Sequence, residues 1–214
     1  MTRIVVAGAG GFGRGVHSWL TQSPQHIAEF DITEIVYIDD SRPAHDPHAP
    51  VVSRISEYRP RNDDRVICAI GSPIVRRRVV DALSAQAVTF HTFIDDRAVV
   101  GIGSRVLQGA IICPGSVLSS NVVVGQHTHI NFNCSIGHDT VLGAFSTLSP
   151  MVNVMGEVKV GEEAFFGGSS TVLPRISIGS TTTIAAGATV TNSVPNGRTV
   201  AGTPARELPL KEER

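Results

Sequence analysis

The sequence is poor in charge and in aromatic side chains. Charged residues make up 17% and aromatic residues 5% of its 214 positions, and the formal net charge is -1. Such a balance offers no electrostatic surface for nucleic acid or an anionic membrane, so neither is expected as a partner. No apolar run reaches the ~18 residues needed to cross a bilayer, and the start of the chain lacks the features of a secretion signal. These features predict a cytoplasmic protein.

Cysteine is also scarce. Cys68, Cys113 and Cys134 are odd in number and widely spaced. This spacing fits neither a disulfide framework nor a zinc site, and no metal is expected. Apolar residues nevertheless make up 42% of the chain, which is enough to build a folded core.

The first part of the chain alternates strand-like and helix-like segments. Apolar strand-like runs occupy residues 3–10, 34–40 and 66–71, and helical spacing of apolar residues occurs in 14–22 and 73–86. Such alternation predicts a parallel α/β sheet.

A glycine-rich loop follows the first of these strands. Gly8–Gly13 reads GAGGFG and satisfies the G-x-G-x-x-G pattern, and Asp39 ends the second strand. A two-lobed dinucleotide fold needs about six strands, for which the residues before Ile94 are too few. A half-fold still offers backbone N–H groups to the phosphate of a sugar nucleotide. The alternative is a tight turn that only packs helix on strand.

From Ile94 the sequence repeats every six residues. Starting at Ile94, every sixth residue is a repeat position. The residue directly after a repeat position is often glycine, and the fourth residue after a repeat position is usually small, as in Cys134 and Thr140. All 17 repeat positions are aliphatic or Phe: Ile94, Val100, Val106, Ile112, Leu118, Val124, Ile130, Ile136, Leu142, Leu148, Val154, Val160, Phe166, Val172, Ile178, Ile184 and Val190.

A six-residue period predicts a solenoid of short parallel strands. Three repeats make one triangular coil of 18 residues, with the large aliphatic side chain on the axis and the small residue beside it. We expect the glycine directly after each aliphatic residue to supply the backbone freedom of a tight corner.

His138 and Asp139 exceed what this repeat requires. One coil places Ser120 before His138 and Gly156 after it, so both neighbours of the imidazole are small. Acyl transfer from a thioester needs a base for the attacking group, and a carboxylate can orient an imidazole in one tautomer. A backbone N–H at a glycine corner suits the oxyanion. The alternative is a solvated corner histidine.

The repeats and the tail segment Gly202-Thr203-Pro204-Ala205-Arg206 resemble the left-handed β-helix acyltransferases. Over roughly residues 3–207 the chain is similar to the sugar O- and N-acyltransferases of the sialic-acid O-acetyltransferase type, which include enzymes acting on UDP- or GDP-linked 4-amino sugars. The resemblance implies an α/β Rossmann-like half-domain over 1–92, which binds the nucleotide sugar. It further implies a left-handed parallel β-helix over 93–214 with its tail, which binds acetyl-CoA as cosubstrate. It also implies a homotrimer with intersubunit active sites.

The resemblance assigns roles to individual residues. His138 matches the general base and Asp139 the acid that orients it. A second histidine common in the family is replaced by Thr147, and His129, one coil earlier, is a candidate for the same role. Phe12 replaces a loop histidine. The implied acyl-CoA contacts are Asn131, Thr147, Gly156, Gly168, Ala186 and Arg206, and the implied substrate contacts are Gly10, Gly11, Phe12, Gly13, Asp39, Asp40, Gly71 and Arg76.

The sequence therefore predicts an acetyl-CoA-dependent acetyltransferase acting on an amino or hydroxyl group of a nucleotide-linked sugar. One alternative is O-acetylation of a free sugar of the sialic-acid type. Another is a metal enzyme like the β-helical carbonic anhydrases, with His127, His129 and His138 as candidate ligands. A third is a solenoid that binds a sugar nucleotide without catalysis.

Overall fold

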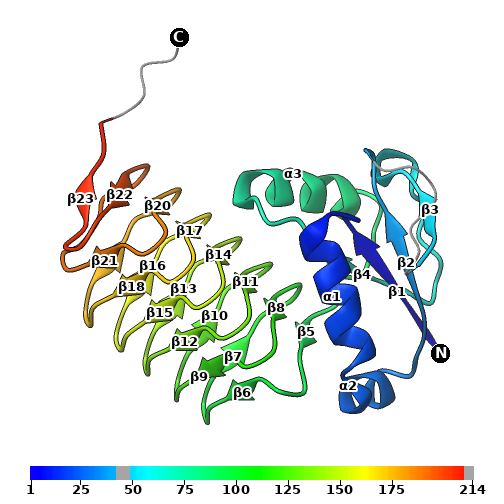
Figure 1. Ribbon diagram of the computed structural model, residues 1–214. Helices are drawn as coiled ribbons and strands as arrows, with labels where there is room; N and C mark the ends of the chain where they lie inside the picture. Colours follow the sequence, from blue (N-terminus) through cyan, green and yellow to red (C-terminus); the bar gives the residue numbers. More distant parts are fainter. Residues whose placement is uncertain (42–48, 210–214) are drawn as a thin grey trace. The chain divides into compact units, whose positions relative to one another are not determined.

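The computed structural model describes residues 1–41 and 49–209 and divides into two compact units, Met1–Asp96 and the residues from Arg97 onward. The predicted fold class, an α/β half followed by a parallel β-helix, is confirmed (Figure 1). The division falls after Asp96, near the boundary expected after residue 92. Within the described ranges, no helix is long and apolar enough to cross a membrane.

The first unit is a four-stranded parallel sheet with the strand order β3-β2-β1-β4. The three predicted strands and two predicted helices are present, and three short elements at 24–29, 51–53 and 55–57 gave no clear sequence signal. The strands are β1 (Thr2–Ala7), β2 (Ile32–Ile38), β3 (Val51–Ser53) and β4 (Asp64–Cys68), with β5 (Phe93–Ile94) near the end of the unit; the helices are α1 (Gly11–Thr21), α2 (Pro24–Glu29), η1 (Ile55–Glu57) and α3 (Pro73–Ser84).

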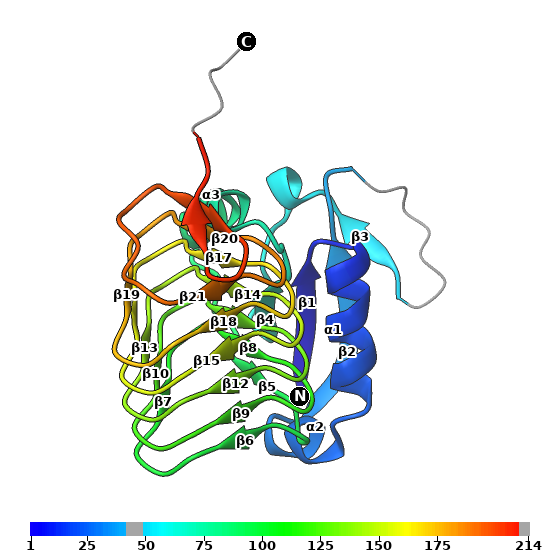
Figure 2. The same ribbon diagram turned by 60° about the vertical axis from the view of Figure 1, so that its left-hand side comes forward.

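The second unit stacks short strands, most of them two residues long and parallel, into three sheets, whose successive coils are visible in Figure 2. Most strands pair with the strands 18 residues before and after them, as Ile136 pairs with Leu118 and Val154. At the end of the unit, Thr199 pairs with Thr183 at an interval of 16 residues, and the last strand, Arg206–Glu207, runs antiparallel to its neighbour. The first sheet contains β6 (Val99–Val100), β9 (Val117–Leu118), β12 (Ser135–Ile136), β15 (Asn153–Val154), β18 (Thr171–Val172) and β21 (Thr189–Val190); the second contains β7 (Arg105–Val106), β10 (Val123–Val124), β13 (Val141–Leu142), β16 (Lys159–Val160) and β19 (Ser177–Ile178); the third contains β8 (Ile111–Ile112), β11 (His129–Ile130), β14 (Thr147–Leu148), β17 (Phe165–Phe166), β20 (Thr183–Ile184), β22 (Thr199–Ala201) and β23 (Arg206–Glu207).

The predicted repeat positions form the core of the β-helix. From Ile112 to Val190 every one of them is buried, whereas Val100 in the first coil is 37% exposed. The small residues four positions later are buried beside them. Their hydroxyl groups bind the backbone of the chain 15 residues on, as Thr140 Oγ1 donates to the Met155 carbonyl at 2.9 Å.

The structure corrects the expected role of the glycines. The left-handed corner residue is the third after each core residue, for example Asp139 with φ 57°, and not the first. The first position is glycine because the coils approach closely there: a Cβ on Gly137 would collide with the backbone nitrogen of Gly156. Glycine therefore provides space at the first position where two coils approach closely, and the left-handed conformation belongs to the third position.

Candidate active site at a corner of the β-helix

The His138–Asp139 pair lies at the corner that follows β12. Nδ1 of His138 is 2.8 Å from Oδ2 of Asp139, and the two side chains are 55% and 52% exposed. The hydrogen bond from His138 and a second one from Asn121 hold the pKa of the Asp139 carboxyl below its usual range. An ionised carboxylate only accepts hydrogen bonds, so Nδ1 carries the proton and Nε2 is the basic nitrogen of the ring.

Gly156 occupies the same position as His138 one coil later. The backbone N–H of Glu157 donates to the His138 carbonyl at 2.8 Å, which fixes the two corners against each other. A Cβ on Gly156 would lie 2.7 Å from Nε2 of His138, so the imidazole fits only over glycine. The 18-residue period predicted that Gly156 lies next to His138, and the structure shows the two residues in contact.

The N–H of Gly156 has no acceptor in the described part of the chain. In another column the amide at this corner position is bonded by the next coil: Ser180 Oγ accepts from the Glu162 N–H at 3.1 Å. An unbonded N–H on the glycine that packs against the imidazole is the kind of donor that an oxyanion at this site would require.

Asn121 is a third member of this corner that the sequence reasoning missed. It lies one coil before Asp139, and its Nδ2 donates to Asp139 Oδ1 at 3.1 Å. The sequence did contain a signal for Asn121, because one coil has 18 residues and position 121 lies 18 residues before Asp139.

The other predicted acyl-CoA residues lie at other places on the β-helix. Gly168 and Ala186 occupy one corner column after the third sheet, and neither amide has an acceptor among the described residues. Asn131 accepts the Phe132 N–H at 2.9 Å with its own side chain. Arg206 lies on β23, is exposed, and donates to the neighbouring Ala205 carbonyl.

Thr147 and His129 lie side by side in β14 and β11. Both are buried, with exposed fractions of 6% and 1%, whereas the His138 side chain is open to solvent. A role for His129 in place of the missing second histidine stays a prediction.

A cleft of about 420 Å³ lies in the first unit at the glycine loop. A Cβ on Gly10, Gly11 or Gly71 would meet no atom within 4 Å, so these glycines leave the cleft wall open to a ligand. Six of the predicted substrate residues line the cleft: Gly10, Gly11, Phe12, Asp39, Asp40 and Gly71.

The structure gives the remaining two predicted substrate residues packing roles. A Cβ on Gly13 would collide with the Gly8 carbonyl, so Gly13 permits helix α1 to approach β1. Arg76 is fully buried and donates from Nη1 to the Ile70 carbonyl at 2.7 Å. Neither residue is among those lining the described cleft. Gly13 and Arg76 therefore support the turns that form the wall of the cleft.

The acidic pair is already engaged by the protein. Asp39 Oδ2 accepts the Ala9 N–H at 2.7 Å and thereby fixes the glycine loop. Its Oδ1 accepts from the N–H and the hydroxyl of Ser41, each at 2.8 Å. Asp40, whose side chain is 48% exposed, accepts from Ser56 at 3.2 Å.

The histidines do not assemble into a metal site. Over residues 1–41 and 49–209, no three or more His, Cys, Asp or Glu side chains are grouped so as to hold a metal ion. His127, His129 and His138 therefore do not converge.

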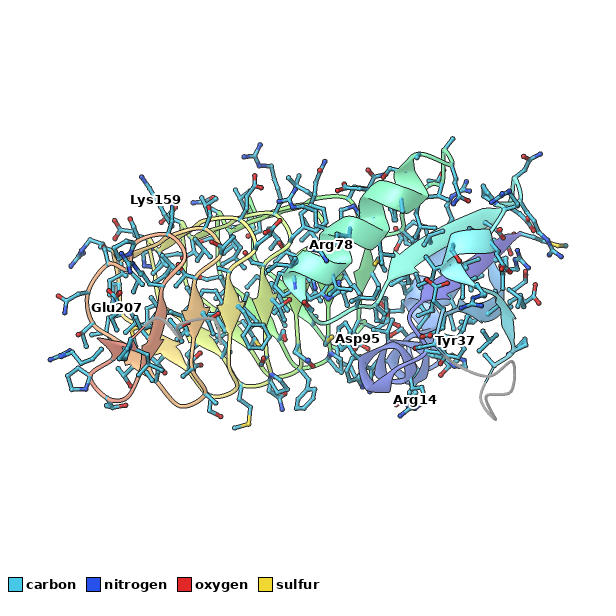
Figure 3. The ribbon with its side chains drawn as sticks, turned by 90° about the horizontal axis from the view of Figure 1, so that it is seen from above. Arg14, Tyr37, Arg78, Asp95, Lys159 and Glu207 are labelled. Carbon is cyan, nitrogen blue, oxygen red and sulfur yellow. The ribbon has the colours of Figure 1, made fainter. Side chains whose placement is uncertain are left out.

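Lys159, a charged side chain on strand β16 of the β-helix, extends away from the coils (Figure 3).

A β-helix of hexapeptide repeats that follows a small α/β unit is the fold of the hexapeptide-repeat acyltransferases to which the sequence is similar. Comparison with known proteins supports the same fold and class. Residues 3–83 match the PglD N-terminal domain, and residues 157–192 match the hexapeptide repeat of succinyl-transferase. The chain therefore joins a PglD-type N-terminal domain to hexapeptide repeats, and the relatives below place it with the sugar acyltransferases of the hexapeptide family.

Among solved structures, the chain is similar to the acetyltransferase domain of PglB from Neisseria gonorrhoeae FA1090 in complex with acetyl coenzyme A. The TM-score is 0.87 at 27% identity, over 96% of this chain and 98% of that one. It is also similar to PerB from Caulobacter crescentus in complex with CoA and GDP-perosamine, with a TM-score of 0.84 at 26% identity over 98% of both chains.

Among curated sequences, GDP-perosamine N-acetyltransferase from Escherichia coli O157:H7 is 28% identical over 145 residues, 65% of this chain and 66% of that protein. UDP-3-O-acylglucosamine N-acyltransferase from Caulobacter sp. (strain K31) is 32% identical over 115 residues, 54% of this chain and 32% of that protein. The chain thus spans less than two thirds of the length of these two curated relatives.

Proposed function

We propose that the chain is an acetyl-CoA-dependent acetyltransferase that acts on an amino group of a nucleotide-linked sugar. The observation that carries the proposal is the corner at His138, where Asp139 holds Nδ1 at 2.8 Å and Nε2 lies against Gly156, whose N–H has no acceptor among the described residues. The relatives that act on or bind GDP-perosamine support this substrate class.

The three residues divide the chemistry of acyl transfer. Nε2 of His138 accepts the proton that the amine loses as its nitrogen bonds to the acetyl carbonyl carbon. The Gly156 N–H donates to the oxyanion of the tetrahedral intermediate. When the carbon–sulfur bond breaks, the imidazolium returns the proton to the departing thiolate, and the Asp139 carboxylate stabilises the imidazolium in between.

Other backbone amides on the β-helix suit the acyl donor. The N–H groups of Gly168 and Ala186 lie one coil apart at one corner and have no acceptor in the described residues, so they can bind amide carbonyls of the pantetheine arm. By resemblance, Asn131 and Thr147 lie along this arm and Arg206 meets the phosphates of the nucleotide. These contacts remain proposals.

The cleft of the first unit suits the nucleotide sugar. Gly10 and Gly11 begin helix α1, where free backbone N–H groups and the helix dipole favour a phosphate. Asp39 shapes this loop, because its oxygens already accept from Ala9 and Ser41. Asp40 is the more exposed acid and is proposed to accept from a ribose hydroxyl, while Phe12 and Gly71 complete the wall.

We further propose a homotrimer with active sites between subunits, working in the cytoplasm. One stack of coils leaves the His138 corner open on its outer side. Val99 and Val117 on the first sheet are 56% and 46% exposed, and a second copy would cover such side chains. Sedimentation or light scattering of the full chain measures this state directly, and a monomeric active enzyme would contradict it.

The main test replaces the base. His138→Asn should lower kcat for acetyl transfer by about 100-fold to 10,000-fold, because it removes general-base catalysis while keeping a polar side chain at an exposed corner. Gln126→Asn changes the same corner position in another column and is expected to keep the wild-type kcat. A folded His138→Asn protein with near-normal transfer would show the mechanism to be wrong.

The acceptor is found with a panel. Wild-type protein is incubated with acetyl-CoA and UDP-, GDP- or dTDP-linked 4-amino sugars, or with free sialic acid, and mass spectrometry reads the acetylated product. Transfer only to free sialic acid would support the O-acetyltransferase reading. An absence of acyl-CoA binding by calorimetry would support a non-catalytic solenoid.

A further inference from the structure

One corner column of the β-helix carries four polar side chains in a row after an initial glycine. It consists of Gly103, Asn121, Asp139, Glu157 and Arg175, which follow one another at 18-residue intervals and all have positive φ between 57° and 75°. We call it the Asn121 column. Asn and Asp adopt this left-handed conformation more readily than other residues with side chains, so the backbone geometry alone accounts for their presence here.

The side chain of Asn121 is oriented along the column. Its Nδ2 donates forward to Oδ1 of Asp139 at 3.1 Å. Its Oδ1 points back toward Gly103, where a Cβ would collide with that oxygen. The absence of a side chain at position 103 therefore makes room for the amide in the orientation that presents its donor to Asp139.

Because of this donor, the two oxygens of the Asp139 carboxylate have different partners. Oδ1 is held by Asn121 and Oδ2 faces Nδ1 of His138 at 2.8 Å. Both partners of the His138–Asp139 pair are half exposed, so packing does not fix them. On the other side, the Glu157 carboxylate is 3.7 Å from Nη1 of Arg175, which balances the negative charge next to Asp139.

We propose that Asn121 is a positioning residue for the base of the acetyl-transfer reaction. It holds the Asp139 carboxylate so that Oδ2 stays on Nδ1 of His138, and this keeps the proton on Nδ1 and leaves Nε2 free beside Gly156. The inference rests on the proposed function, in which His138 Nε2 accepts the proton of the attacking amine.

The chain contains its own control for this role. Asn133 lies in the same coil at the equivalent position of another corner, with φ 55°, and faces Gly115 as Asn121 faces Gly103. One coil later its column continues with Met151 instead of a carboxylate. A variant of Asn133 therefore reproduces the backbone effect of an Asn121 variant without touching a carboxylate–histidine pair.

The test uses the full chain with Asn121→Gly, Asn121→Asp and Asn133→Gly. Glycine and aspartate both tolerate positive φ, so these variants are expected to fold. With ¹⁵N-labelled histidine, NMR reports the tautomer of neutral His138. The wild type and Asn133→Gly should hold the Nδ1–H form almost exclusively. Asn121→Asp, which sets a second carboxylate against Asp139, and Asn121→Gly should each raise the Nε2–H fraction several-fold.

A second spectroscopic measurement follows Asp139 itself. Because the Asn121 hydrogen bond contributes to the lowered pKa of the Asp139 carboxyl, Asn121→Gly should move that pKa up toward the ordinary aspartate value. In transfer assays with acetyl-CoA and GDP-perosamine, Asn121→Gly and Asn121→Asp should lower kcat by about fivefold to 50-fold with KM unchanged. Asn133→Gly should change neither constant.

The outcomes separate the two proposals. If His138→Asn keeps transfer activity, the proposed function fails. If His138→Asn is inactive while both Asn121 variants keep the wild-type tautomer and kcat, only the role of Asn121 is overturned. If Asn133→Gly lowers kcat as much as Asn121→Gly, the effect belongs to the corner backbone and the positioning role is also overturned.

Discussion

Two corners of one coil differ in what they can do although their backbones are alike. Asn121 and Asn133 both have positive φ, 59° and 55°, and both face a glycine one coil back. One coil forward the first corner has His138-Asp139 where the second has Pro150-Met151. The repeat therefore supplies the same platform at each corner, and two side chains convert one corner into a candidate active site.

The largest expected effect removes the charge that distinguishes the two corners. Asp139→Asn keeps the size of the side chain and its tolerance for φ 57°, but it no longer stabilises an imidazolium and can favour the wrong tautomer. We expect kcat for acetyl transfer to fall by about 100-fold or more, with little change in the melting temperature of an exposed site. Steady-state kinetics and thermal unfolding measure both.

Met151→Asn is the matched control for that variant, because it places asparagine at the same position of the second corner. It should leave kcat within about twofold of the wild type. Equal losses in the two variants would mean that the corners do not differ in function.

The next largest effect concerns a buried histidine pair in the first unit, in contrast to exposed His138. Nε2 of His26 is 2.8 Å from Nε2 of His91, and both side chains are buried. Burial, followed by the nearby charges of His26 and Arg65, lowers the pKa of His91 to about 4, and burial also lowers the pKa of His26. The folded state therefore binds fewer protons than the unfolded state between about pH 4 and 6.5.

Stability should be complete above about pH 6.5 and decrease as the pH falls toward 4, by on the order of 2 kcal/mol at pH 5. Urea unfolding of the first unit, followed by the fluorescence of Trp19, measures it. His91→Phe should flatten this dependence, and His138→Asn should leave it unchanged. An equal slope in wild type and His91→Phe would refute the assignment.

A smaller effect follows from the close approach of Gly156 to the imidazole. Gly156→Ala puts a methyl group 2.7 Å from where Nε2 now lies, so the ring must move. We expect a loss of about tenfold in kcat. Gly197→Ala provides the comparison, since that glycine has φ 69° and its nearest neighbour, Thr181 Oγ1, is 3.8 Å from an added Cβ. It should lower the melting temperature by a few degrees through backbone strain but keep kcat.

The sequence predicted the β-helix well because its period depends on a local rule. Each core position recurs after six residues, and adding 18 to His138 gives Gly156, which the structure places against the ring. The same rule would have found Asn121, but its role as donor depends on a side-chain orientation that the period does not contain. The reason for the glycines was also hidden, because the close approach at Gly137 involves the backbone of another coil.

In the first unit the motif pointed to a ligand-binding loop but not to the role of each residue in it. Gly10 and Gly11 line the cleft, whereas Gly13 and Arg76 serve the turns behind it. A spacing pattern names residues that lie near one another in the chain. It does not show whether Asp39 faces a ligand or accepts from the Ala9 N–H, as it does.

The smallest expected effect asks whether the amide–carboxylate contact in the Asn121 column also stabilises the fold. Met151→Asp gives the second corner the same Asn–Asp pair without a histidine, because Pro150 stands at the position of His138. Exposed polar contacts of this kind contribute little, so the free energy of unfolding should change by less than about 0.5 kcal/mol and kcat should not change. Urea unfolding of the wild type and the variant measures the difference. A gain of 1 kcal/mol or more would mean that the pair at Asn121 and Asp139 stabilises the corner by itself, and losses in Asn121 variants would then have to be divided between stability and positioning of the imidazole.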